Sequence, residues 1–280
     1  MNEVSEQIRA ELLEALENDQ LVLPTLPEVA LQVRETAADP YVDIPKLTSV
    51  IQSDTALTAR LIKVANSPLL RASRPIEDLK MAVGRLGINY TSNLATSLAM
   101  EQMFQATSDV IDQRMRAAWS RSTEVAAIAH VLARHYTRLK PDQATLAGIV
   151  HRIGVLPILT FAENNRRLLR DSDALDALIE DLHPRIGRRI LQSWDFPAEL
   201  QLIPEEHLNF ARAPATVDYA DVVMVAYLQS LLDTGHPLTQ MDWSQVSAFD
   251  RLGLAPEVHS ADDEDLSAEM EAAMALLNGD

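Results

Sequence analysis

The sequence predicts an all-helical protein, and three observations point to that fold class. Glycine is scarce, with 8 residues in 280, and aromatic residues make up only 5% of a chain that is 47% hydrophobic. Ala, Leu, Glu, Gln and Arg, which favour helices, recur throughout. Apolar residues return at helical spacing, whereas strand-like alternation and a glycine-rich phosphate loop are absent from the sequence. We therefore expect many helices around a sizeable core.

The charge and the residue inventory exclude several classes of function. The formal net charge of -17 repels nucleic-acid phosphates, so no nucleic-acid partner is expected. Without cysteine, the chain has no disulfide, no thiolate nucleophile and no cysteine-ligated metal. Residues 1–20 do not resemble a signal peptide, and no later stretch reaches about 20 uncharged apolar residues, so no membrane association is expected. These features indicate a soluble, cytoplasmic protein.

Several short helices are expected in the first 105 residues. Residues 1–19 contain one amphipathic helix, because apolar side chains from Val4 to Leu16 repeat every four positions. Later helices are bounded by local signals: Asp43 and Asp78 cap two of them, and a glycine or a proline ends others. The expected segments are 28–38, Asp43 through Ile51, Asp54 to Pro68, Asp78 to Gly87, and 89–104.

The second part of the chain is also predicted to be helical. Residues 143–161 form an almost uncharged run and should be the most buried helix. Prolines at 184 and 197 are expected to separate short helices, since proline disfavours a helix interior. Acidic residues accumulate after Arg251 in a mobile linker, followed by a terminal helix with apolar residues on one face that could dock on the body or on a partner. The expected helices are 109–139, 143–161, 174–182, 185–194, 197–210, 215–232 and one containing Leu266 to Leu277.

Histidine and aspartate are the residues that could carry chemistry, because cysteine and a Gly-x-Ser-x-Gly turn are both absent. His151 interrupts the most apolar run, where an imidazole needs a hydrogen-bond partner or a metal. Asp221 lies among valines and needs a partner as well, and His183 and His207 stand at helix boundaries. The alternative is structural: a hydrogen-bonded core histidine, and Asp218 and Asp221 complementing the start of their helix.

Other charged residues carry weaker signals. Two arginine clusters could receive an anionic ligand or an acidic partner, or form a solvated face neutralised by the aspartates around 171–181. We interpret His130 as a packing residue, and His236 and His259 as loop residues without a functional signal. The clusters comprise Arg166, Arg167, Arg170, Arg185, Arg188 and Arg189.

Several motifs in order make the chain resemble the HDOD family, a branch of the HD superfamily of metal-dependent phosphohydrolases. The resemblance covers about residues 20–233. The motifs are LPTLPEVALQV from Leu23, VIQSDTALTARLIKVANSPLL from Val50, AVGRLGIN from Ala82, Trp119 with Ser122, LAGIVHRIGVLPIL from Leu146, LHPRIGRRILQSWDFP from Leu182, the His207 region and Ala220-Asp221. The resemblance implies an HD-like fold with an N-terminal helical lobe over 20–105 and an HD-like lobe over 106–233, followed by the linker and terminal helix of 234–280.

The resemblance also implies where a metal site would lie and how it has degenerated. In an active HD enzyme, a histidine, a His-Asp doublet and a distant aspartate bind divalent metal. Here the first histidine corresponds to Arg121, and the doublet reads His151-Arg152. A unit charge facing a divalent ion at about 4 Å costs roughly 8 kcal/mol at an effective dielectric near 20. The remaining candidate ligands are His151, His183, His207 and Asp221, with Asp218 as an alternative to Asp221.

Three functional hypotheses follow. The first is a noncatalytic module of bacterial signal transduction that needs no cofactor and binds a signalling protein or a small anionic ligand. The second is a divergent phosphohydrolase that retains weak divalent-metal binding through the remaining ligands. In the third, Arg121 and Arg152 pair with Asp221 in a salt-bridged core, or hold a phosphate at the former metal site. The sequence leaves the oligomeric state open.

Overall fold

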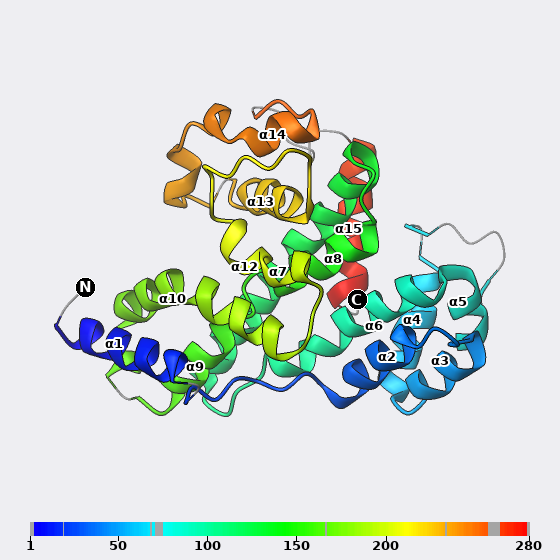
Figure 1. Cartoon of the computed structure of the whole chain (residues 1–280), viewed down its shortest axis with the longest axis horizontal. Helices are drawn as coiled ribbons and strands as arrows, with labels where there is room; N and C mark the ends of the chain where they lie inside the picture. Colours follow the sequence, from blue (N-terminus) through cyan, green and yellow to red (C-terminus); the bar gives the residue numbers. More distant parts are fainter. Residues whose placement is uncertain are drawn as a thin grey trace.

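The computed structural model is all-helical, as the sequence predicts. It describes residues 3–18, 20–67, 69–70, 75–165, 167–232, 234–256 and 264–278, and it contains no strand within those ranges. The helices form two lobes beside a long central helix (Figure 1). One large cluster of buried apolar side chains runs through both lobes. The two lobes therefore share a continuous core.

The N-terminal lobe consists of short helices whose ends are set by the local signals in the sequence. Asp43, Asp54 and Asp78 each accept a hydrogen bond from a backbone N–H in the first turn of the helix that follows. Gly87 ends one helix with a φ of 83°, which favours glycine. The helices are α2 (Glu28–Ala38), α3 (Ile44–Ile51), α4 (Thr55–Ala65), α5 (Leu79–Leu86) and α6 (Ile88–Ala99), followed by the 3-10 helix η1 (Met100–Met103).

The C-terminal lobe is built on α7 (Asp109–Tyr136), which packs against α8, α9 and α13. Most of α8, α9 and α13 is buried, because these helices pack on α7 and on further helices. The elements after α7 are α8 (Pro141–Val150), α9 (Val155–Glu163), η2 (Leu168–Arg170), α10 (Ser172–Ser193), α11 (Ala198–Gln201), α12 (Ile203–Glu206), α13 (Tyr219–Ser230), η3 (Pro237–Gln240), η4 (Trp243–Gln245) and α14 (Ser247–Leu252).

Three helix predictions in this lobe were wrong in their boundaries. The expected helix over 143–161 is interrupted by a turn at residues 151–154, so that α8 and α9 are separate. The expected break at His183-Pro184 does not occur: α10 runs through Pro184, because its buried apolar face outweighs the local cost of the proline. The expected helix over 197–210 is instead the two one-turn helices α11 and α12.

The stretch Pro141–Glu163 is long and apolar enough to cross a membrane by length and composition, which the sequence prediction did not anticipate. In the structure, 83% of its most apolar window is buried inside the protein. Packing against the rest of the core therefore accounts for its apolar character.

The two terminal helices both pack on the body. Helix α1 (Glu3–Glu17) contacts α10 and buries Ile8 and Leu12 there. Helix α15 (Glu264–Asn278) buries its apolar face on α7, where Glu269 accepts hydrogen bonds at 2.8 Å from Arg134 and pairs with His135 at the same distance. The terminal helix was predicted to dock on the body or on a partner, and in the structure it docks on the body. The core of the expected acidic linker, including Glu257, His259, Asp262 and Asp263, lies outside the described residues.

Two glycines allow a close crossing between the turn before α9 and helix α10. A Cβ on Gly154 would lie 2.0 Å from the carbonyl oxygen of His183 and 2.5 Å from the backbone nitrogen of Gly187. Ordinary van der Waals contact begins well beyond those distances, so only glycine fits at this crossing. The crossing places the buried side chain of His183 next to the turn that carries His151.

We predict that Gly154→Ala destabilises the fold, because the added methyl group would force α10 away from the turn. The expected loss is about 1 to 3 kcal/mol of unfolding free energy, measured by urea denaturation. Gly84→Ala is the matched control: it lies inside α5, and its nearest contact is Ile44 at 3.8 Å. That control should be neutral or stabilising by up to about 1 kcal/mol. Equal effects of the two substitutions would show that the close crossing does not constrain the fold.

Candidate functional site

Three buried histidines converge at the turn between α8 and α9, and the first of them belongs to that turn. His151 follows the last residue of α8, His183 lies within α10, and His207 follows the last residue of α12. All three are fully buried. The ring centroid of His207 lies 5.0 Å from that of His151 and 6.0 Å from that of His183, and the ring of Tyr227 packs against His151 and His207. We call this group the histidine cluster.

Hydrogen bonds fix part of the cluster and leave several ring nitrogens without a partner. The Nδ1 of His151 lies 2.6 Å from the carbonyl oxygen of Gly148, and the Nδ1 of His207 lies 2.9 Å from that of Ile203. In neutral imidazole rings these nitrogens must donate, so the proton lies on Nδ1. Within the described residues, the Nε2 atoms of His151 and His207 and both nitrogens of His183 have no hydrogen-bond partner.

The cluster is held in its neutral form. Burial is the largest cause and lowers the pKa of His207 to about 3, and it lowers the pKa of His151 and His183 well below the usual value. The positive charge of Arg152 lowers the pKa of all three further, and Arg121 contributes at His151. Fixed positive charge therefore stands next to the imidazoles.

Asp221, the fourth expected ligand, takes part in a network of ion pairs with two arginines instead. Both of its carboxylate oxygens accept from Arg251, at 2.7 and 2.8 Å, and one also accepts from Arg212. Asp218 caps α13 and forms a reciprocal capping box with Asp221. The helix-start interpretation of the two aspartates thus describes their geometry, and both remain bonded to arginine.

Arg121 and Arg152, which the resemblance aligned with ligand positions, pair with carboxylates other than Asp221. Arg121 donates to Glu124 at 3.0 Å and to the carbonyl oxygen of Ser230 at 2.6 Å. Arg152 donates to Glu180 at 2.6 Å and contacts the hydroxyl of Tyr227 at 3.5 Å. The hypothesis that Arg121 or Arg152 pairs with Asp221 was therefore wrong in its partners. Arg212 and Arg251 fill that role, and no sequence signal had marked them.

The residues present do not fit a divalent metal. The unpartnered imidazole nitrogens favour one, yet no group of three or more His, Asp or Glu side chains in the described ranges has a geometry that could hold a metal ion. The carboxylate that a hard divalent ion would need is neutralised by two guanidinium groups. The charge of Arg152 beside the histidines adds a repulsive contribution.

Above the histidine cluster, the surface opens into a cleft of about 470 Å³ that we call the arginine cleft. Its polar lining comes from α7, the turn after α8, α10 and α13, and its apolar wall includes Val155 and Leu159. The sequence analysis missed Arg114, Tyr227 and His236 as lining residues. A signal existed, because residues 114, 117, 118 and 121 share one helical face with two arginines around two alanines. The polar residues that matter are Arg114, Arg121, Arg152, Asp176, Glu180 and Tyr227.

The basic clusters seen in the sequence lie elsewhere and have different partners from those expected. Arg185 pairs with Glu17 at 3.7 Å and Arg188 with Glu205 at 2.5 Å. The acidic residues expected to neutralise them pair with other arginines: Asp176 with Arg114, Glu180 with Arg152, and Asp181 with Arg9. Arg166 lies outside the described residues.

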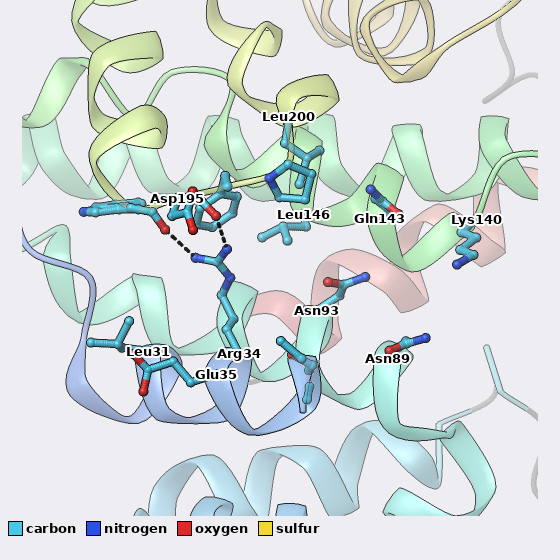
Figure 2. Close-up of a pocket in the computed structure, with 16 residues that line it drawn as sticks. Leu31, Arg34, Glu35, Asn89, Asn93, Lys140, Gln143, Leu146, Asp195 and Leu200 are labelled. Carbon is cyan, nitrogen blue, oxygen red and sulfur yellow. Dashed lines mark hydrogen bonds between the residues drawn. The ribbon is translucent and has the colours of Figure 1, made fainter. Parts of the chain in front are cut away.

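A second cleft of about 440 Å³ separates the two lobes. Figure 2 shows Arg34 reaching across it from α2, and its guanidinium donates at 3.0 Å to the carbonyl oxygens of Trp194 and Asp195. The same group lies 3.8 Å from the centroid of the Phe196 ring. Asn93 and Gln143 line the other end of the cleft (Figure 2). Arg34 thus connects the lobes, and no sequence signal had distinguished it.

The fold and the site define a class of protein: an HD-like helical body with three buried histidines side by side. The HDOD domain model matches residues 23–210, more than half of the chain. The chain belongs to the HDOD family. Asp221 and its partners Arg212 and Arg251 lie beyond the matched region.

Several known proteins are similar to this chain in sequence or in fold. A crystal structure of a candidate metal-dependent phosphohydrolase from Shewanella amazonensis SB2B is 33% identical, with a TM-score of 0.87 over 98% of this chain and 99% of that one. A candidate signal transduction protein from Marinobacter aquaeolei VT8 shares the fold at 24% identity, with a TM-score of 0.68 over 98% of this chain and 66% of that one. A Treponema pallidum (strain Nichols) protein is 26% identical over 250 residues, or 81% of this chain, which spans less than half of that protein, 46%.

We predict that Asp221→Asn strongly destabilises the protein, because it leaves Arg212 and Arg251 partly buried without their shared counter-charge. The expected loss is about 3 to 5 kcal/mol in urea unfolding. Glu180→Gln is the control, since its carboxylate is half-exposed and its ion pair with Arg152 is expected to contribute less than about 1 kcal/mol. A loss below that control value for Asp221→Asn would contradict a structural role for the network.

We also predict that acid weakens the fold through the histidine cluster. In the unfolded chain a histidine titrates near about pH 6.5, whereas in the fold the three imidazoles have lowered pKa values. The unfolded state therefore binds more protons below about pH 6.5, and stability is lost as the pH falls below that value, by up to about 1.4 kcal/mol per pH unit for each histidine.

Urea unfolding at pH 7, 6 and 5 measures this slope. NMR of the imidazole protons provides a check without mutation, because His151, His183 and His207 should keep their neutral-form shifts at pH 5. Titration of these signals near pH 6.5 would contradict the prediction.

Proposed function

We propose that this protein is a noncatalytic HDOD signalling module that binds an anionic ligand, or an acidic surface of a signalling partner, through the arginine cleft. The observation that carries the proposal is the position of Arg152: its guanidinium lines the cleft and lowers the pKa of the three histidines beneath it. A site with permanent positive charge next to neutral imidazoles favours an anion over a cation.

The charge distribution supports this function. Three arginines line the arginine cleft, on a chain with a formal net charge of -17, and each has a carboxylate partner: Asp176 for Arg114, Glu180 for Arg152 and Glu124 for Arg121. These guanidinium groups can form charge-assisted hydrogen bonds with an anion in place of the carboxylates, while the overall charge disfavours long polyanions such as nucleic acid. We expect the module to act in the cytoplasm, where an acidic partner would meet it.

The second candidate function is a divergent metal-dependent phosphohydrolase. Two observations favour it: the unpartnered nitrogens of the histidine cluster, and the 33% identity to the Shewanella amazonensis protein named as a candidate enzyme of that kind. The commitment of Asp221 to two arginines weighs against it.

Turnover and metal content distinguish the two candidates. Protein purified without chelator should contain no stoichiometric divalent metal by elemental analysis, and it should release no product from bis(p-nitrophenyl) phosphate or a cyclic dinucleotide with added Mn²⁺. The physical reason is the loss of the ligand set and the charge of Arg152. Turnover that disappears in His151→Ala would overturn the noncatalytic proposal and support the phosphohydrolase.

A further inference from the structure

In each of two ion pairs of the arginine cleft, the arginine is less exposed than its carboxylate partner. Arg152 and Arg114 have side chains that are 15% and 25% exposed, whereas their partners Glu180 and Asp176 are 49% and 58% exposed. The arginines are thus held in the wall of the cleft, and the carboxylates lie at its outer side. Exposed ion pairs of this kind are weak, because water solvates the carboxylate nearly as well as the guanidinium does.

The two carboxylates come from one face of one helix. Asp176 and Glu180 are four residues apart on α10, and Ser172, four residues earlier, accepts a hydrogen bond at 2.6 Å from Arg114. The arginines come from α7 and from the turn after α8. One edge of α10 therefore supplies two carboxylates to arginines from other elements. These carboxylates occupy the positions that an anionic ligand would take at the two guanidinium groups.

The arginines retain hydrogen-bonding capacity for another anion. Each of the two makes one contact with its carboxylate in the described structure, although a guanidinium has five donors and pairs best with two oxygens at once. Tyr227 also lines the cleft, and a phenol hydroxyl is protonated at neutral pH, so it is able to donate. These donors surround a space with an apolar wall at Val155 and Leu159.

We infer that the ligand of the arginine cleft is a phosphate monoester, whose phosphoryl group replaces Glu180 and Asp176 at Arg152 and Arg114. Charge balance favours this class: displacing two carboxylates removes two negative charges, and a phosphate monoester carries about -1.5 to -2 at pH 7, whereas one carboxylate or sulfate ester restores only one. The apolar wall receives the organic part. This inference rests on the proposed function and specifies its ligand.

Phenyl phosphate is the probe, and phenyl sulfate is its monoanionic control of similar shape. We expect calorimetry on the full chain at fixed ionic strength to show about tenfold tighter binding of the phosphate, from the additional charge-assisted hydrogen bonds. Arg152→Gln should weaken phenyl phosphate binding about tenfold for the same reason. Equal affinity for the two probes, or binding unaffected by Arg152→Gln, would overturn the inference.

Glu180→Gln tests the replacement step without removing any binding group. It should strengthen phenyl phosphate binding about fivefold to tenfold, because the ligand no longer competes with the carboxylate for Arg152. Asp181→Asn is the matched control: it removes the same charge one residue away, from a side chain that pairs with Arg9 on α1. An equal gain in both variants would indicate only a change in overall charge and would contradict the replacement.

Phosphorus NMR of the same samples separates the failure of this inference from that of the proposed function. Release of inorganic phosphate that stops in His151→Ala would overturn the noncatalytic function while leaving phosphoryl recognition intact. Absence of both binding and release would overturn the inference and leave the noncatalytic function standing. A phosphotyrosine peptide with Gly-Ser flanks distinguishes the sources: tighter binding than phenyl phosphate indicates a phosphorylated protein, and weaker binding indicates a phosphorylated small molecule, and either result supports the shared chemistry.

Discussion

The charge of Arg152 beside three buried imidazoles is the constraint on which the rest of the site depends. Burial is the main cause that keeps the histidines neutral, and the charge of Arg152, which a guanidinium cannot lose at accessible pH, adds to it. Here, packing against Tyr227, two backbone carbonyls and the close crossing at Gly154 hold the rings in place. These protein contacts are therefore sufficient to fix the positions of the three histidine rings.

The buried carboxylate of Asp221 also needs a neutralising charge, since an unpaired buried carboxylate is costly. Arg212 and Arg251 supply it, and Arg251 comes from α14, beyond the region that the family model matches. Asp221 therefore connects α13 to the segment that follows the matched region.

Local chemistry in the sequence was enough to predict the fold class and many helix ends. Asp43, Asp78 and Gly87 act through neighbours within a few residues, so their roles could be inferred without tertiary structure. Pro184 behaved differently, because the packing of distant helices decides whether a proline interrupts α10. The resemblance to family positions singled out the three histidines, but the sequence left open whether they converge.

The partners of the charged residues could not be predicted, because they are set by contacts between distant segments. Arg251 lies 30 residues from Asp221, and Arg114 lies 62 residues from Asp176. Each pairing depends on how α7, α10 and α14 cross, which charge patterns within one helix do not encode. The sequence therefore indicated which residues depart from the family pattern more readily than it indicated their partners.

Helix α10 contacts four separate parts of the molecule: the histidine cluster, the arginine cleft, α1 and the N-terminal lobe. One face carries His183 into the histidine cluster, another sets Asp176 and Glu180 against the arginine cleft, and Asp181 holds α1. The carbonyl oxygen of Trp194, just after its last residue, accepts from Arg34 of the N-terminal lobe. A helix moves as a rigid element. If a change in the ion pairs on one face shifts α10, the contacts made by its other faces change as well. In the proposed function, such a connection would carry the effect of ligand binding in the arginine cleft to the surfaces that pack on the other faces of α10.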